Sequence, residues 1–288
     1  MVPMVINMKL RPARWPFSLE KWYIGALLSD GSVLHISLGG LRIMGVPLAR
    51  VEAELHRPGL PLVRGTTPAR FLAGGGSVLQ CGSARIDHEK LHFETPGLSG
   101  QLSFKPRFAP TQLQDALLQD GERKLEWFVE IPDADVSGRI TWPGGSLNVD
   151  GRGYRDRFYY DMLPWRTHCK DLKWGRALTQ SHSAIWMEGI TPMTRTRAMW
   201  RNGERCEDNP PVVQNESMRV LSKDDVVNLH GSQLGVMRPL LSRLSGHPVE
   251  VKQTGVASLG GERGVAILSS VHWKEVLPPP LCPPRKIY

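Results

Sequence analysis

The sequence predicts an all-β protein built from two stacked antiparallel β-barrels. Along most of its 288 residues, short segments alternate apolar with polar side chains, and turn residues separate these segments at short intervals. Helical periodicity is scarce, because only residues 110–119 have the pattern of a short helix or lid element. The two halves carry a similar number of expected strands although no sequence repeat relates them, which favours two stacked barrels.

A hairpin over residues 22–38 is the clearest element of the first half. Its two alternating segments flank Ser29, Asp30 and Gly31, and Asp-Gly is a preferred pair for a tight turn between antiparallel strands. Further strands are expected, in chain order, at residues 46–55, 77–81, 90–94, 100–104, 126–131 and 137–142. We assign these elements to a first barrel that covers residues 1–148.

The second half follows the same pattern and is assigned to a second barrel over residues 149–275. After a stretch rich in aromatic residues, strands are expected at residues 184–189, 196–201, 217–221, 226–234, 248–257 and 264–275. The remaining segment, residues 276–288, is rich in proline, which predicts an extended tail without a packed core of its own.

Residues 151–176 form the stretch that is densest in groups able to stack, donate protons or hold charge. Side chains alternate faces along a strand, so an aromatic strand over residues 154–160 has two different faces. One face carries Tyr154, Asp156, Phe158 and Tyr160, and the other carries Arg155, Arg157 and Tyr159. One face is therefore aromatic with a single carboxylate, and the other combines two guanidinium groups with a phenol.

The spacing of this stretch resembles the signature of the lipocalin-like family that includes carotenoid 1,2-hydratase, AttH-like proteins and decalin-forming Diels–Alderases. The matching residues are Gly151, Gly153, Tyr154, Asp156, Pro164, Trp174, Gly175 and Arg176. Arg155 and Arg157 stand where the family pattern has two histidines. Residues 22–32, with the pattern W-Y-x-x-A-x-L-x-D-G-S, resemble the first strand pair of the same family. The resemblance implies two lipocalin-like barrels and an enzyme of secondary metabolism that uses no cofactor.

Tyr and Trp side chains at a contact between barrels predict a dry, elongated, apolar pocket for a polyene or isoprenoid chain. If Asp156 points into such a pocket, desolvation raises its pKa and could make it a neutral acid near pH 7. Arg155 and Arg157 would oppose that shift if they lie close to it, and the sequence does not decide between the two effects. That acid could protonate an alkene while aromatic faces stabilise the resulting cation. A pericyclic ring closure instead needs a folded substrate and a donor to its carbonyl group, for which Arg176, Tyr154 or Tyr160 could serve.

We therefore expect catalysis by Asp156, Tyr154 and Arg176. The expected substrate-binding residues are Tyr23, Arg155, Arg157, Tyr160, Trp165, Trp174, Trp186 and Glu188. The expected activity is cofactor-independent cyclisation or isomerisation of an apolar polyene or isoprenoid-type biosynthetic intermediate. Two alternatives stay open: a hydratase that adds water to an isoprenoid C=C bond, and a non-catalytic carrier of an apolar metabolite.

Charge and cysteine content limit the other partners. The net charge is +8, yet no run of Lys or Arg and no basic helix indicates a nucleic-acid partner. The four cysteines are scattered, and no residues have ligand spacing, so no zinc site, disulfide framework, metal or cofactor is expected. The N-terminus lacks the apolar core of a signal peptide and no stretch approaches 18 apolar residues, so we expect a cytoplasmic protein without an integral membrane segment. Peripheral membrane contact and the oligomeric state are left open.

Overall fold

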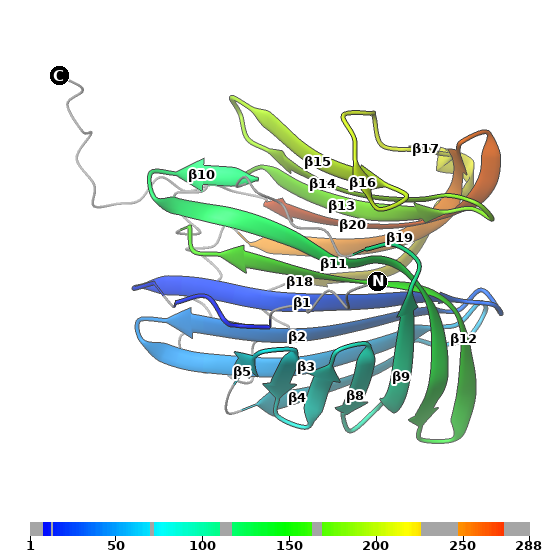
Figure 1. Ribbon diagram of the computed structural model, residues 1–288, viewed down its shortest axis with the longest axis horizontal. Coiled ribbons are helices and arrows are strands. Elements are labelled where there is room, and N and C mark those ends of the chain that lie inside the picture. The colour runs from blue at the N-terminus through cyan, green and yellow to red at the C-terminus, as the bar shows by residue number, and fades with distance from the viewer. Residues whose placement is uncertain are drawn as a thin grey trace.

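The computed structural model of the protein describes residues 8–12, 14–69, 72–109, 117–162, 169–225 and 247–273. Within these ranges the chain folds into two curled, barrel-like sheets that stack on each other, and every strand pair is antiparallel (Figure 1). The predicted all-β class with two stacked barrels is confirmed. No helix among the described residues is long and apolar enough to cross a membrane.

The first sheet has twelve strands and runs from the N-terminus to the aromatic stretch. Its strands are β1 (Phe17–Leu28), β2 (Val33–Ile43), β3 (Val46–His56), β4 (Val63–Ala69), β5 (Leu72–Gly75), β6 (Val78–Cys81), β7 (Ala84–Asp87), β8 (Lys90–Glu94), β9 (Ser99–Pro106), β10 (Leu118–Asp120), β11 (Arg123–Trp142) and β12 (Gly145–Tyr160). The order across the sheet is β4-β3-β2-β1-β12-β11-β9-β8-β7-β6-β5, and β10 pairs with β11. The long strands β1, β11 and β12 therefore lie at its centre.

The second sheet has eight strands and holds the rest of the described chain. Its elements are β13 (Asp171–Leu178), β14 (Ser183–Ile190), β15 (Arg195–Arg201), β16 (Glu204–Arg205), β17 (Val212–Val213), the short 3₁₀ turn η1 (Asn215–Ser217), β18 (Arg219–Asp225), β19 (Pro248–Leu259) and β20 (Glu262–Trp273). The order is β16-β15-β14-β13-β20-β19-β17, and β18 pairs with β19.

Alternation explains why the first sheet curls around a core. On β1, Trp22, Ile24 and Ala26 point into the barrel and are almost fully buried, as are Val51 and Ala53 on β3. Removing one large apolar side chain of this kind from water stabilises the fold by about 1.5–3 kcal/mol. The intervening residues of β1, β2 and β3 must point the other way, toward the second sheet.

Two predicted strands of the first half merge. Residues 126–131 and 137–142 both belong to β11, which continues through register shifts on either side of Ile131. A bulge of this kind bends a strand without ending it, and the residues between the two predicted segments therefore stay paired. Because β11 is one strand of 20 residues and not two shorter strands, it pairs with β12 along the whole length of β12.

The aromatic stretch belongs to the first sheet. Residues 151–160 of β12 pair with β1 on one side, and β12 pairs with β11 on the other side from Gly145 to Tyr160 with two register shifts. The change from the first sheet to the second consequently falls between Tyr160 and Asp171, later in the chain than the expected boundary after residue 148.

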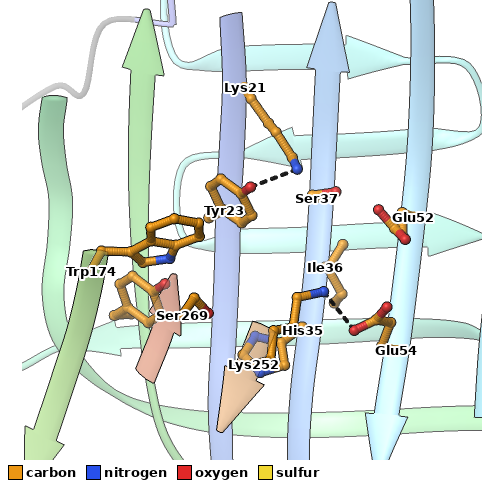
Figure 2. Close-up of a pocket in the computed structure, with 11 residues that line it drawn as sticks. Lys21, Tyr23, His35, Ile36, Ser37, Glu52, Glu54, Trp174, Lys252 and Ser269 are labelled. Atoms are coloured by element: carbon orange, nitrogen blue, oxygen red, sulfur yellow. Dashed lines mark hydrogen bonds and ion pairs between the residues drawn. The ribbon is translucent and has the colours of Figure 1, made fainter. Parts of the chain in front are cut away.

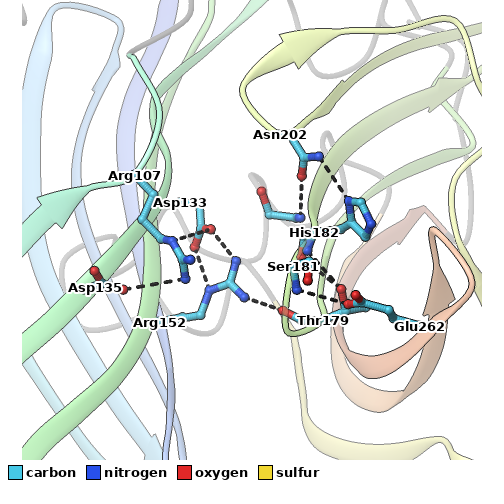
Figure 3. A network of polar contacts seen from close by, with 10 residues as sticks. Arg107, Asp133, Asp135, Arg152, Thr179, Ser181, His182, Asn202 and Glu262 are labelled. Atoms are coloured by element: carbon cyan, nitrogen blue, oxygen red, sulfur yellow. Dashed lines mark hydrogen bonds and ion pairs between the residues drawn. The ribbon is translucent and has the colours of Figure 1, made fainter.

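Aromatic side chains and ion pairs join the two sheets. Trp127 of β11 and Trp200 of β15 meet edge to face, with ring centroids 5.1 Å apart, inside a cluster that both sheets build. At another point of the contact, Arg152 of β12 donates hydrogen bonds to Asp133 of β11 and to the carbonyl oxygen of Thr179, which follows β13 (Figure 3). The two barrels are therefore packed against each other through both apolar and polar contacts.

Several expected elements lie outside the described residues. These are the strand at 226–234, the tail 276–288 and most of the helix or lid at 110–119. The last two residues of that expected helix, Leu118 and Gln119, are in β10, so the helical prediction is wrong there. They pair with Leu125 and Lys124 at the start of β11, and strand pairing satisfies their backbone groups instead.

Candidate functional site

A cavity lies between the outer face of the first sheet and the facing side of the second. The lining residues come from β1, β2, β3, β12, β13, β19 and β20 and are Lys21, Tyr23, His35, Ile36, Ser37, Glu52, Glu54, Tyr154, Trp174, Lys252 and Ser269 (Figure 2). Strands far apart in the sequence thus meet around one space.

One end of the cavity is aromatic. The ring of Tyr23 stacks on Phe158 with centroids 5.8 Å apart and lies 5.8 Å from the ring of Trp174 at a tilt of 48°. Tyr154 lines the same end and belongs to the same apolar cluster. Stacked and tilted aromatic rings offer flat apolar walls whose π-faces can also stabilise a cation. This end fits the expected binding of an unsaturated chain.

The other end of the cavity is charged, which corrects the expectation of a uniformly dry, apolar pocket. Lys252 of β19 donates a hydrogen bond to Glu54 of β3 at 2.7 Å, and Arg64 of β4 forms a 2.6 Å ion pair with the same carboxylate. Burial raises the pKa of Glu54, but the hydrogen bond from His56 and the two cations outweigh it and hold the pKa well below its usual range. Glu54 is therefore an ionised anchor between the sheets.

Two further ionisable side chains line the cavity between its ends. Lys21 donates a 2.6 Å hydrogen bond to the hydroxyl oxygen of Tyr23, and burial lowers the pKa of Lys21 to about 8. Burial also lowers the pKa of His35 well below its usual range, so its imidazole is neutral. The Nε2 atom of His35 is buried and has no hydrogen-bond partner among the described residues.

Asp156 is a buried acid beside the aromatic end. Its Oδ2 atom accepts a 3.0 Å hydrogen bond from the indole of Trp127, while Oδ1 has no partner among the described residues. Desolvation raises the pKa of Asp156 to about 7, against the opposing effects of the Trp127 hydrogen bond and of Arg176. Asp156 does not itself line the cavity, but Tyr154, two residues earlier on the same face, and Tyr23, its partner on β1, both do.

Tyr154 and Arg176 lie next to this acid. The guanidinium carbon of Arg176 is 4.6 Å from the centroid of the Tyr154 ring, and its Nη1 atom donates a 3.1 Å hydrogen bond to the carbonyl oxygen of Gly25. Burial raises the pKa of Tyr154 above its usual range and lowers the pKa of Arg176 to about 10, so the phenol is neutral and the guanidinium charged near pH 7. The structure therefore brings together all three residues expected to be catalytic.

Gly25 makes this approach possible. A Cβ atom at this position would lie 2.7 Å from Cε1 of Tyr154 and 3.4 Å from Nη2 of Arg176. Contacts under 3.0 Å are not tolerated without movement, and both the ring and the neighbouring strands are packed. The absence of a side chain on β1 thus sets where Tyr154 and Arg176 lie.

Arg155 and Arg157, expected to bind substrate, point away from the cavity. Strand alternation sends both into the first barrel, where Arg155 donates a 2.8 Å hydrogen bond to Glu130 and Arg157 lies over the ring of Phe128. Both guanidinium groups therefore lie on the opposite face of β12 from Asp156.

The remaining expected substrate-binding residues are divided. Tyr23 and Trp174 line the cavity, whereas Tyr160 packs against the cluster between the sheets with its ring edge-on to Phe17. Trp186 lies in the core of the second sheet, and Glu188 is ion-paired with Arg195 at 2.9 Å, so neither lines the cavity. Trp165 lies outside the described residues.

Seven ionisable or polar lining residues and one aliphatic one were not predicted from sequence: Lys21, His35, Ile36, Ser37, Glu52, Glu54, Lys252 and Ser269. The signal for part of this set is present in β3, where Arg50, Glu52, Glu54 and His56 alternate with apolar residues. Such a pattern usually marks a solvent-exposed face, but all four side chains are buried. No group of three or more potential metal ligands occurs among the described residues.

Solved structures with the same architecture are similar to this chain. An AttH-like protein from Nitrosomonas europaea aligns with a TM-score of 0.62 over 95% of this chain and 99% of its own, at 14% identity. CghA crystallised with Sch210972 aligns at 0.59 over 93% and 94%, also at 14% identity. Kievitone hydratase from Nectria haematococca aligns at 0.53 over 88% of both chains, at 10% identity. These likenesses confirm the fold that the sequence resemblance implied.

The sequence matches no protein-family model and no curated protein.

Proposed function

We propose that the protein is a cofactor-independent cyclase or isomerase that acts on a polyene or isoprenoid-type biosynthetic intermediate in the cavity between the two barrels. The single observation that carries this proposal is the burial of Asp156 beside an aromatic wall, which raises its pKa to about 7 so that a large fraction of the carboxyl group keeps its proton near neutral pH. Among the similar structures, CghA is a Diels–Alderase and another is a hydratase, which supports an enzyme of one of these two classes.

Tyr154 is the donor best suited to a pericyclic closure. It lines the cavity, its phenol is neutral, and Arg176 holds its ring from one side. A hydrogen bond from the Tyr154 hydroxyl to a carbonyl oxygen conjugated with the substrate's alkene would lower the energy of the transition state. The rings of Tyr23 and Trp174 would hold the chain in a folded conformation, which supplies the entropic part of the acceleration.

Asp156 is the group best suited to a proton-initiated closure. Because Asp156 does not itself line the cavity, its proton would reach the substrate through the hydroxyl of Tyr154, which does: the hydroxyl gives its proton to one alkene carbon, leaves a cation on the other and takes the proton of Asp156. An internal π-bond then captures that cation, and the carbon next to the new cationic centre returns a proton to the Asp156 carboxylate by the same route, which restores the acid. Atoms and charge balance without a cofactor, and the faces of Tyr23 and Trp174 stabilise the cationic intermediate.

A hydratase remains the second candidate because the charged end of the cavity has polar atoms that could hold a water molecule. His35 Nε2 and Glu52 Oε1 are buried without hydrogen-bond partners among the described residues, and an ordered water bridging such groups is the usual solution. That water could capture the same cation in place of an internal π-bond. A carrier would need neither the acid nor the donor.

Conversion of substrate by the purified protein tests the proposal. A panel of linear polyenes and prenyl compounds is incubated with the protein without nucleotide or metal, and the products are separated by chromatography and weighed by mass spectrometry. A product of unchanged mass and altered retention supports ring closure or isomerisation, and a product heavier by one water supports the hydratase. Bound but unaltered ligand throughout the panel would leave only the carrier.

A further inference from the structure

Arg176 is a buried cation with most of its hydrogen-bonding capacity unused. Only 2% of the residue is exposed, and within the described part of the chain its one hydrogen bond runs from Nη1 to the carbonyl oxygen of Gly25. The Nε and Nη2 atoms are buried without partners among the described residues, and none of the acids described there forms an ion pair with Arg176. Burial removes water from this guanidinium, and the Gly25 carbonyl oxygen, the Tyr154 ring and the charges of Asp133 and Asp156 replace only part of it, because Nε and Nη2 stay without partners.

The two unused nitrogens lie on the same edge of the guanidinium plane. Their N–H bonds run parallel and match the two oxygens of a carboxylate, which is the geometry of bidentate recognition. The plane cannot rotate freely, since Nη1 is held by Gly25 and one face packs on the ring of Tyr154 at 4.6 Å. The fork is thus fixed in orientation before any ligand arrives.

A second cation of the site also lacks a carboxylate. Lys21 lines the cavity, and its ammonium donates to the hydroxyl oxygen of Tyr23 without an ion pair to any acid in the described part of the chain. Lys252 and Arg64, in contrast, are both engaged by Glu54. Glu54 is therefore committed to Lys252 and Arg64, while Lys21 and Arg176 form no ion pair with an acid among the described residues.

We propose that Arg176 binds the carboxylate of the substrate, which narrows the substrate class to amphiphilic acids: an unsaturated apolar chain that ends in a carboxylate or an equivalent two-oxygen acid. Lys21 supplies additional positive potential along the cavity wall. The chain then lies against Tyr23 and Trp174 in the cavity. Arg176 does not itself line the cavity, but it packs on the ring of Tyr154, which does. This inference rests on the proposed function for the location of the substrate, but its test does not depend on turnover.

Binding of matched probes tests the fork. Decanoate and decan-1-ol share a chain and differ in the acid head, whereas acetate carries the head alone; binding of each is measured by titration calorimetry. We expect the wild-type protein to bind decanoate at least about tenfold more tightly than decan-1-ol, as a charge-assisted bidentate pair requires. Acetate should bind far more weakly than decanoate, and equal affinities would show a site for free anions and overturn the amphiphilic class.

Two conservative substitutions make the result specific. Arg176→Lys keeps the charge and removes the fork, so it should abolish most of the preference for decanoate over decan-1-ol. Arg157→Lys is the matched control, because Arg157 on β12 is also buried but faces the inside of the first barrel. Melting temperatures confirm that both variants are folded. Equal loss of preference in both variants, full preference in Arg176→Lys, or no decanoate binding by the wild-type protein would overturn the inference.

Turnover separates this inference from the proposed function. If the protein prefers decanoate through Arg176 but converts no polyene or prenyl compound, the carboxylate site is supported and the proposed catalytic function is refuted. If it converts a neutral polyene but has no preference for a carboxylate, the catalytic function is supported and the carboxylate site is refuted.

Discussion

Replacing Asp156 with asparagine should lower turnover and, above neutral pH, raise stability. Asparagine keeps the shape of the side chain and can still accept the hydrogen bond from the Trp127 indole, but it has no proton to donate. If Asp156 is the general acid, kcat should fall by a factor of about 10²–10⁴, the usual contribution of acid catalysis, while ligand affinity changes little.

The stability change follows from the raised pKa. Folding raises the pKa of Asp156 from 3.8 to about 7, mainly through desolvation. An acid with a raised folded-state pKa contributes stability that is fully present below the unfolded-state pKa and is lost as the pH rises through the folded-state value. Three pKa units at about 1.4 kcal/mol each give a loss of up to ~4 kcal/mol between about pH 4 and pH 8, and the asparagine variant escapes this loss.

Urea unfolding of both proteins at about pH 5 and about pH 8 measures this difference, because other titrating groups cancel in the comparison. The free energy of unfolding of the variant should increase relative to that of the wild-type protein as the pH rises. Asp133→Asn is the matched control: Asp133 is equally buried but ion-paired with Arg152, so the same change should destabilise the protein by roughly 3–5 kcal/mol. If Asp156→Asn destabilises the protein at the higher pH as Asp133→Asn does, Asp156 is an anchor for cations and the reasoning fails.

Three other substitutions and one treatment have defined outcomes. Tyr154→Phe removes the cavity's phenolic donor and should lower kcat about tenfold to a thousandfold with little change in melting temperature, as steady-state kinetics and thermal unfolding would reveal; unchanged kcat would exclude a donor role. Gly25→Ala puts a Cβ atom 2.7 Å from the Tyr154 ring and should lower the free energy of unfolding by about 1–3 kcal/mol. Gly39→Ala is the control, because its Cβ atom would have its nearest neighbour at 3.5 Å and should lower that free energy less. Equal losses in urea unfolding would contradict the close approach at Gly25. Glu54→Gln leaves Lys252 and Arg64 without their shared carboxylate and should destabilise the protein by about 3–5 kcal/mol. Unchanged stability would mean that the Glu54–Lys252 ion pair does not hold the two sheets together. Treatment with EDTA should leave turnover unchanged, and loss of turnover that a divalent ion restores would refute a metal-free reaction.

Local sequence patterns were sufficient to predict most strands and the side chains at the aromatic end of the site. The alternation of residues 154–160 separated Tyr154 and Asp156 from Arg155 and Arg157, and the structure keeps the two pairs on opposite faces of β12. The burial argument identified desolvation as the effect that raises the pKa of Asp156, and the structure decides its balance with Arg155 and Arg157 by placing both guanidinium groups on the other face of β12. These predictions succeeded because they depend on strand geometry and desolvation, both of which act over a few residues.

The charged end of the cavity could not be predicted because it depends on which surfaces meet. Glu54 and Lys252 are 198 residues apart in sequence, and each sits on a strand whose polar face looks solvent-exposed when considered alone. Stacking of the second sheet on β3 buries both side chains, and pairing across the contact then becomes necessary. Alternation gives the face of a residue but not the identity of what covers that face.

The titration of Asp156 tests the central claim, a neutral carboxylic acid held beside the cavity, most directly. Carbon-13 labelling of the aspartate carboxyl groups allows their signals to be followed by NMR as the pH changes, and the signal missing from Asp156→Asn identifies the residue. Our account predicts a midpoint near pH 7, in agreement with the pKa of about 7 that burial produces. A midpoint at or below about pH 4, the range of an ordinary aspartate, would contradict it.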